Sequence, residues 1–158
     1  MSSHRIILNL RAARSVIFAL ALDPVVWRRF PSNAKVTSFE LVPPGCCQQG
    51  TVIRQIRLAG GRSRTTEVAL LDYRPPESFS MGWHLPIGSG GISGVVTTAL
   101  EETPDGTRLT AVTDIESKGG LSKLLEIVCR PLMKRSQRAD LEVLRLIAEG
   151  ELNKAPTA

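Results

Sequence analysis

Clusters of glycine and proline divide the middle of the chain into short segments, and their spacing constrains the fold more than any other feature. They lie at residues 43–45, 60–61, 75–76, 88–91 and 104–106. Such clusters mark turns. The segments between them are too short for the helical crossovers that parallel strands need, so residues 35–116 are predicted to form an antiparallel meander of about six strands.

A strand and two helices are predicted before this meander. Residues 4–10 read as a first strand, and residues 12–22 read as a helix with a mostly apolar surface. Asp23 is a favourable N-cap residue and Pro24 is favoured at the first helical position. A second, short helix is therefore predicted over residues 25–30.

One long amphipathic helix is predicted after the meander. Apolar residues recur at helical spacing over residues 121–149, and Pro131 inside this segment is expected to kink or break the helix. A seven-stranded sheet can bury its apolar face only by wrapping around this helix, so the fold class is α+β, and a cavity is expected between the two. We expect a single domain over residues 1–150 and a flexible tail over residues 151–158.

Composition narrows the classes of function. The 158 residues are 42% hydrophobic and 22% charged, which suits one globular domain, and no run approaches the roughly 18 apolar residues of a stable membrane insertion. The net charge of +5 is spread over short clusters without interleaved aromatics, so a solvated surface is favoured over nucleic-acid binding. The cysteines and histidines lack metal-site spacing, and Cys46 and Cys47 are expected to be reduced thiols in a cytoplasmic protein. No cofactor is predicted.

Trp83 and His84 are adjacent in the segment of residues 79–87. Successive side chains of a strand point to opposite faces, so His84 is predicted to be a surface residue on the face opposite Trp83. Trp83 is predicted to belong either to the core or to the wall of a ligand pocket. Its face also carries Phe79, Met81, Leu85 and Ile87.

Several weak motifs occur in a characteristic order: residues 15–24 followed by Trp27, then Gly50-Thr51, Thr66-Glu67, residues 73–76, Asp105-Gly106-Thr107, and the amphipathic C-terminal segment. In this order and spacing, the chain resembles the START-like superfamily, also labelled SRPBCC or polyketide cyclase/dehydrase, from about residue 5 to residue 149. The resemblance implies the helix-grip fold: a curved seven-stranded antiparallel sheet around a long C-terminal helix, with two short helices after the first strand. It also implies a hydrophobic cavity for apolar molecules, with cyclisation or dehydration in some members.

In the predicted strand of residues 65–73, Glu67, Leu71 and Tyr73 share one face by alternation. The family pattern favours this face as the inward one, so Glu67 is predicted to point inward. A buried carboxylate needs a partner, so a salt bridge from Glu67 to Arg54 is predicted, with a general acid or base role as the alternative. Tyr73 is a candidate hydrogen-bond donor to a ligand or a structural residue. Trp27 is predicted to cap the core, with ligand stacking as the alternative.

Two main functions follow from the sequence. The first is binding of a hydrophobic or amphipathic molecule of lipid, polyketide or aromatic type by a monomer or homodimer. The second is a cyclase/dehydrase in which Glu67 or Tyr73 transfers a proton, although no nucleophile, base and orienting residue occur together. A protein-interaction domain with a basic contact face is a third possibility. The predicted ligand contacts are Phe79, Met81, Trp83, Leu85, Tyr73, Glu67, Arg54, Trp27, Leu125 and Val128.

Overall fold

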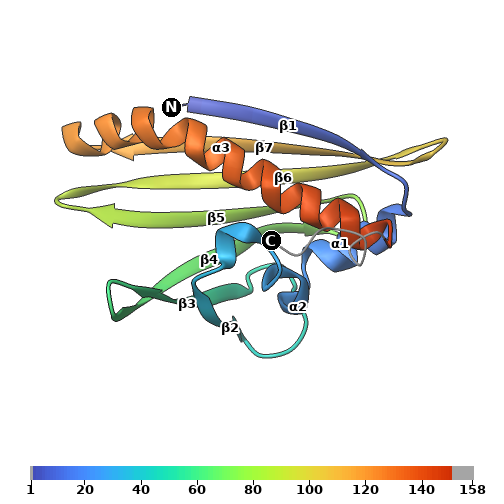
Figure 1. Cartoon of the computed structure of the whole chain (residues 1–158), viewed down its shortest axis with the longest axis horizontal. Coiled ribbons are helices and arrows are strands. Elements are labelled where there is room, and N and C mark those ends of the chain that lie inside the picture. Colours follow the sequence, from blue (N-terminus) through green and yellow to red (C-terminus); the bar gives the residue numbers. More distant parts are fainter. Residues whose placement is uncertain (1, 151–158) are drawn as a thin grey trace.

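The computed structural model describes residues 2–150 and shows a single antiparallel sheet with helices on one of its faces (Figure 1). The seven strands run in the order β1-β7-β6-β5-β4-β3-β2, so the β1–β7 pair is the one that joins strands not consecutive in the chain. The predicted α+β fold and its turns are confirmed. The strands are β1 (Ser2–Leu10), β2 (Val36–Val42), β3 (Val52–Ala59), β4 (Arg62–Arg74), β5 (Ser78–Ile87), β6 (Gly90–Thr103) and β7 (Gly106–Lys118).

The helices begin and end close to the predicted positions. They are α1 (Arg14–Ala21), α2 (Pro24–Trp27), the 3-10 turn η1 (Pro31–Asn33) and α3 (Gly120–Ala148). The Asp23 side chain accepts a hydrogen bond from the backbone N–H of Val25 at 2.8 Å, as expected of an N-cap. The α3 helix continues across Pro131, so a break there, one of the two predicted outcomes, is wrong. The tail predicted over residues 151–158 lies outside the described residues.

The hydrophobic core fills one end of the space between the sheet and α3. Ile6, Leu109 and Phe79 point from the inner face of the sheet toward α1 and the C-terminal half of α3. Trp27 is buried at the edge of this core, where its indole N–H donates to the Ala21 carbonyl at 2.8 Å. Its ring centroid lies 5.5 Å from that of Phe39. The predicted capping role of Trp27 agrees with this position.

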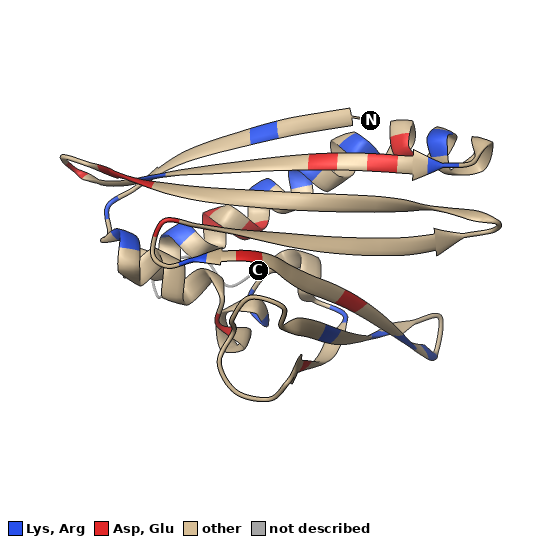
Figure 2. Ribbon diagram, turned by 180° about the vertical axis from the view of Figure 1, so that it is seen from behind, with Lys and Arg blue, Asp and Glu red and all other residues tan. Residues whose placement is uncertain are grey.

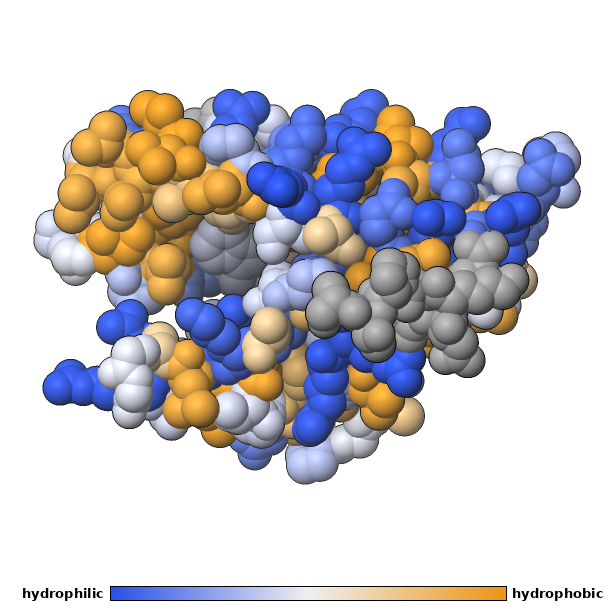
Figure 3. Space-filling view, viewed as in Figure 1, coloured by the Kyte–Doolittle hydropathy of each residue, from blue (hydrophilic) through white to orange (hydrophobic). Residues whose placement is uncertain are grey.

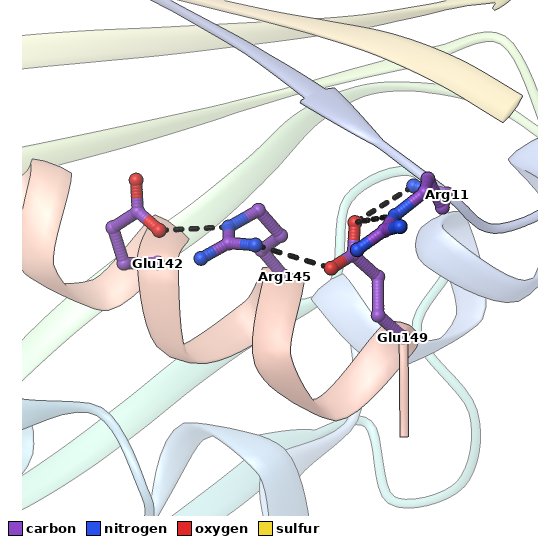
Figure 4. Close-up of polar contacts among 4 residues, drawn as sticks. All are labelled: Arg11, Glu142, Arg145 and Glu149. Atoms are coloured by element: carbon purple, nitrogen blue, oxygen red, sulfur yellow. Dashed lines mark hydrogen bonds and ion pairs between the residues drawn. The ribbon is translucent and has the colours of Figure 1, made fainter. Parts of the chain in front are cut away.

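The C-terminal half of α3 is fixed by apolar packing and by a buried carboxylate. Leu144 is buried among the core residues. The Glu149 side chain accepts a hydrogen bond from the backbone N–H of Arg11 at 2.8 Å and another from the Arg145 guanidinium at 3.1 Å (Figure 4). These contacts join the end of α3 to the segment that follows β1.

The N-terminal half of α3 meets the sheet through polar side chains. Glu126 accepts hydrogen bonds from the hydroxyls of Ser2 on β1 and Ser117 on β7. About three turns further along α3, Gln137 Oε1 lies 2.8 Å from His4 Nε2. Polar contacts therefore join the N-terminal half of the helix to the sheet, and five of the apolar residues in this half are exposed.

Candidate functional site

The inner face of β5 continues beyond the point where the core ends. Phe79 is buried in the core and Met81 packs against it, but Trp83 is only half-buried and Leu85 is 47% exposed. The four are alternate residues of β5, so their side chains all point to the same face of the sheet, the one on which α3 lies. A row of apolar side chains thus passes from the core into accessible space.

Gly94 on β6 holds Trp83 against the sheet. The two residues are direct cross-strand partners, and a β-carbon at Gly94 would lie 2.4 Å from Cζ2 of the indole. Any larger residue at position 94 must displace the ring. The absence of a side chain therefore lets Trp83 lie flat along the inner face.

The N-terminal half of α3 forms the opposite side of this space. The helix packs against β1, β6 and β7. On the inner face of β5 beyond Met81, Leu85 is 47% exposed. Leu125 is half-buried and Val128 is largely exposed. Figure 3 shows a hollow next to the apolar atoms at the upper left, where Figure 1 places the first turns of α3. We call this space the α3–β5 groove.

The predicted ligand contacts separate into distinct places. Trp83 and Leu85 lie on the sheet side of the α3–β5 groove, and Leu125 and Val128 belong to the helix beside it. Phe79, Met81 and Tyr73 lie at its closed end, where the Tyr73 ring centroid is 5.5 Å from that of Phe18. Trp27 is in the core, and Glu67 and Arg54 lie on the other face of the sheet.

The inward position predicted for Glu67 is wrong, and the reason is a β-bulge in β4. The register of β4 against β5 shifts between Leu70 and Asp72, so Leu70 and Tyr73 both face inward while Leu71 and Glu67 face outward. The predicted pair with Arg54 is confirmed: Arg54 Nε lies 3.2 Å from Glu67 Oε1. Glu40 is a second partner of the same arginine, at 3.0 Å. Both carboxylates raise the pKa of Arg54, first through the hydrogen bond to Glu67.

The bulge also creates a shallow depression on the outer face of the sheet, which the sequence interpretation missed. It has a volume of about 750 Å³ and is open to solvent, and its lining includes Trp83 and Leu85 besides the outward-facing Leu71 and His84. The side chain of Leu71 covers the backbone of Gly82, and His84 forms one border, with Nδ1 hydrogen-bonded to Ser93 Oγ at 2.9 Å. His84 is exposed, as predicted. Figure 2 shows that this region of β5 and β6 carries no charged residues.

The adjacent cysteines Cys46 and Cys47 lie away from the α3–β5 groove. Cys46 is exposed, and Cys47 donates to the Leu22 carbonyl at 3.5 Å. Burial raises the pKa of the Cys47 thiol, with smaller contributions from Cys46 and Asp23. A raised pKa keeps the sulfur protonated at neutral pH, so Cys47 lacks the thiolate character of a reactive cysteine. Over residues 2–150, no group of side chains has the composition of a metal site.

Glu126 offers a test of how firmly the helix side of the α3–β5 groove is attached. Its pKa is lowered, chiefly by the hydrogen bond from Ser117 and then by that from Ser2. A lowered pKa means that the ionised side chain stabilises the folded protein above the usual pKa of glutamate, and that this contribution disappears as the pH falls through the lowered value.

We expect Glu126→Ala at neutral pH to accelerate amide hydrogen exchange over residues 120–133 by roughly tenfold, the effect of losing hydrogen bonds to a charged acceptor. Exchange over residues 140–148 should be unchanged, because apolar packing holds that half. Lys123→Ala, at an exposed position on the same helix, is the control. Uniform acceleration along α3 would show that the helix opens as one unit.

No protein-family model and no curated protein sequence matches the chain. Among solved structures, an uncharacterized protein from Rhizobium leguminosarum is 17% identical with a TM-score of 0.74, and the match covers 95% of each chain. The di-domain ARO/CYC protein StfQ from the steffimycin biosynthetic pathway is 15% identical with a TM-score of 0.69, over 96% of this chain and 52% of that one. Ara h 8.0201 is 12% identical with a TM-score of 0.63, over 90% and 97% of the two chains.

These similarities are structural and concern the fold. They agree with the strand order, with the short helices after β1, and with the long α3 lying across the inner face of the sheet. The fold inferred from the order of the sequence motifs is therefore confirmed: the chain has the helix-grip fold of START-like proteins.

Proposed function

We propose that the protein binds a hydrophobic or amphipathic small molecule in the α3–β5 groove. The observation that carries this proposal is the half-exposed Leu85, which continues the inner apolar face beyond the end of the core. Leaving such a surface accessible on both the sheet and the facing helix costs free energy in water, and an apolar ligand removes that cost. Trp83 adds a flat aromatic surface to the same wall.

The chemistry of the walls indicates the class of ligand. The β5 strand contains no Lys, Arg, Asp or Glu, so no charged group on it meets the buried part of a ligand. The exposed helix beside the opening is basic, which favours a negatively charged or polar head at the mouth. Lipids and aromatic polyketides both have this amphipathic character, and the description of StfQ supports including polyketides among the molecules tested.

The cyclase/dehydrase alternative loses one of its two candidate residues. Proton transfer by Glu67 needs the carboxylate beside the ligand, but this side chain lies on the outer face, paired with Arg54. Tyr73 does face inward, where it packs against Phe18 in the core. Ligand binding is therefore the function that the geometry supports best.

Leu85 and Leu71 form a matched pair for testing this proposal. They are 47% and 48% exposed, and they lie on opposite faces of the sheet. In a Trp27→Phe background, Trp83 is the single tryptophan, and its emission reports binding of the amphipathic anionic probe 1-anilinonaphthalene-8-sulfonate by energy transfer. We expect Leu85→Gln to weaken this binding roughly fivefold, because burial of its exposed apolar area is lost.

Leu71→Gln is expected to bind the probe as the parent protein does. Far-UV circular dichroism checks that each variant is folded. If Leu71→Gln weakens binding and Leu85→Gln does not, the ligand occupies the outer depression and the proposed groove is wrong. A probe that leaves Trp83 emission unchanged at saturation would also contradict the proposal.

A further inference from the structure

The N-terminal half of α3 exposes a continuous apolar stripe. Its members recur at helical spacing, and each side chain is between 59% and 72% exposed. Monomeric soluble proteins rarely expose a contiguous apolar patch without using it. In Figure 3 the stripe contributes to the orange region at the upper left. The stripe consists of Leu121, Leu124, Ile127, Val128 and Leu132.

A basic stripe runs beside it on the same exposed side. Between residues 120 and 138 the sequence has five basic residues and one acidic residue, Glu126. Glu126 faces the sheet, where Ser2 and Ser117 hold it. The exposed side of this half of the helix therefore carries only positive charge. At 100° per residue, Lys123, Arg130 and Lys134 fall next to the apolar stripe, and Arg135 and Arg138 fall within its angular range. Arg130 also donates a hydrogen bond to the Ser3 carbonyl at 2.9 Å.

The charge decides which partner suits this surface. A second copy of the chain would bring two sets of like charges together around the apolar contact, which opposes association. An anionic lipid surface instead offers apolar chains to the stripe and negative headgroups to the lysines and arginines. No helix within residues 2–150 is long and apolar enough to span a membrane.

We propose that the N-terminal half of α3 docks onto anionic lipid bilayers, with Leu121, Leu124, Ile127, Val128 and Leu132 inserted at the headgroup boundary and the neighbouring basic side chains paired with lipid phosphates. Glu126 makes its hydrogen bonds to β1 and β7 from the sheet-facing side of this half, and the five side chains of the apolar stripe remain exposed and available for the bilayer. This proposal does not rest on ligand binding in the α3–β5 groove.

Co-sedimentation of the full chain with vesicles tests the proposal. Vesicles of phosphatidylcholine with 30% phosphatidylglycerol, on the order of a cytoplasmic-leaflet surface charge, are compared with pure phosphatidylcholine. We expect at least about tenfold stronger binding to the anionic vesicles, weakened as salt is raised from about 0.05 to 0.5 M. Ile127→Gln and Lys134→Gln are each expected to weaken binding roughly fivefold, through lost apolar insertion and lost charge pairing.

Two controls carry the same substitutions at exposed positions far from the helix. Leu58→Gln and Arg62→Gln, on the β3–β4 hairpin, should bind within about twofold of wild type, since neither side chain reaches a bilayer docked on α3. Leu85→Gln should also bind vesicles like wild type, so a failure of the groove proposal and a failure of this one are distinguishable.

Equal binding to the two kinds of vesicle, or no binding to either, would overturn the proposal. Sedimentation velocity tests the alternative, in which a second copy of the chain binds to the apolar stripe. A wild-type dimer that Ile127→Gln converts to a monomer would assign the apolar stripe to a contact between copies of the chain, and lipid docking by this face would then be rejected.

Discussion

Leu144→Ala is expected to lower the free energy of unfolding by about 2–5 kcal/mol, the range for large cavities in well-packed cores. Leu144 is 2% exposed and packs in the centre of the core formed by the sheet, α1 and α3. Truncation removes its buried methyl groups and leaves a cavity that the seven-stranded sheet cannot collapse to fill. Urea unfolding followed by circular dichroism measures the change.

The same substitution at Leu132 is the control. Leu132 lies on the same helix and is 63% exposed, and alanine is at least as good a helix former as leucine. Leu132→Ala should therefore change the unfolding free energy by less than about 0.5 kcal/mol. A comparable loss at both positions would mean that the N-terminal half of α3 is packed against another surface in solution, contrary to the structure.

Glu149→Ala is expected to destabilise the protein by about 2–3 kcal/mol, because hydrogen bonds to a buried charge are lost. The Glu149 side chain is 4% exposed and accepts from both the backbone of Arg11 and the guanidinium of Arg145. Its removal takes the acceptor away from a backbone N–H at the point where β1 leads into α1. Thermal unfolding should shift downward by about 4–10 °C for a domain of this size.

Glu142 provides the matched control for this prediction. It is paired with the same Arg145 at 2.8 Å, but its side chain is 39% exposed. Glu142→Ala should cost less than about 0.5 kcal/mol, as exposed ion pairs do. Equal losses in the two variants would indicate that the charge of Arg145, rather than the burial of Glu149, sets the effect.

The architecture could be predicted from the sequence because each boundary has a local cause. Turn residues at 60–61, 88–91 and 104–106 close hairpins whose partners are neighbours in the chain, so strand pairing follows from their order. The Asp23–Pro24 start of α2 likewise depends on two adjacent residues. Such short-range signals can be recognised without knowing the tertiary structure.

The site could be predicted only in part, because two of its determinants are not local. The bulge between Leu70 and Asp72 reverses the alternation of faces along β4, and only the pairing with β5 reveals it. The family pattern correctly placed Tyr73 inward, but carrying that face back along the strand to Glu67 put Glu67 on the wrong face. Helical periodicity gives the apolar side of α3, but it does not give the path of the helix across the sheet. Leu124 and Leu144 both belong to the amphipathic pattern, yet only Leu144 meets the core.

The unequal attachment of α3 has a consequence for how such a chain can evolve. Within residues 121–132, the five side chains of the apolar stripe are at least 59% exposed and contribute little to folding, so many substitutions of them leave the protein as stable as before. The same positions border the α3–β5 groove and carry the exposed apolar and basic stripes. Selection can therefore change what this surface recognises while the C-terminal half of the helix preserves the fold, which makes the first turns of α3 the segment most open to functional divergence.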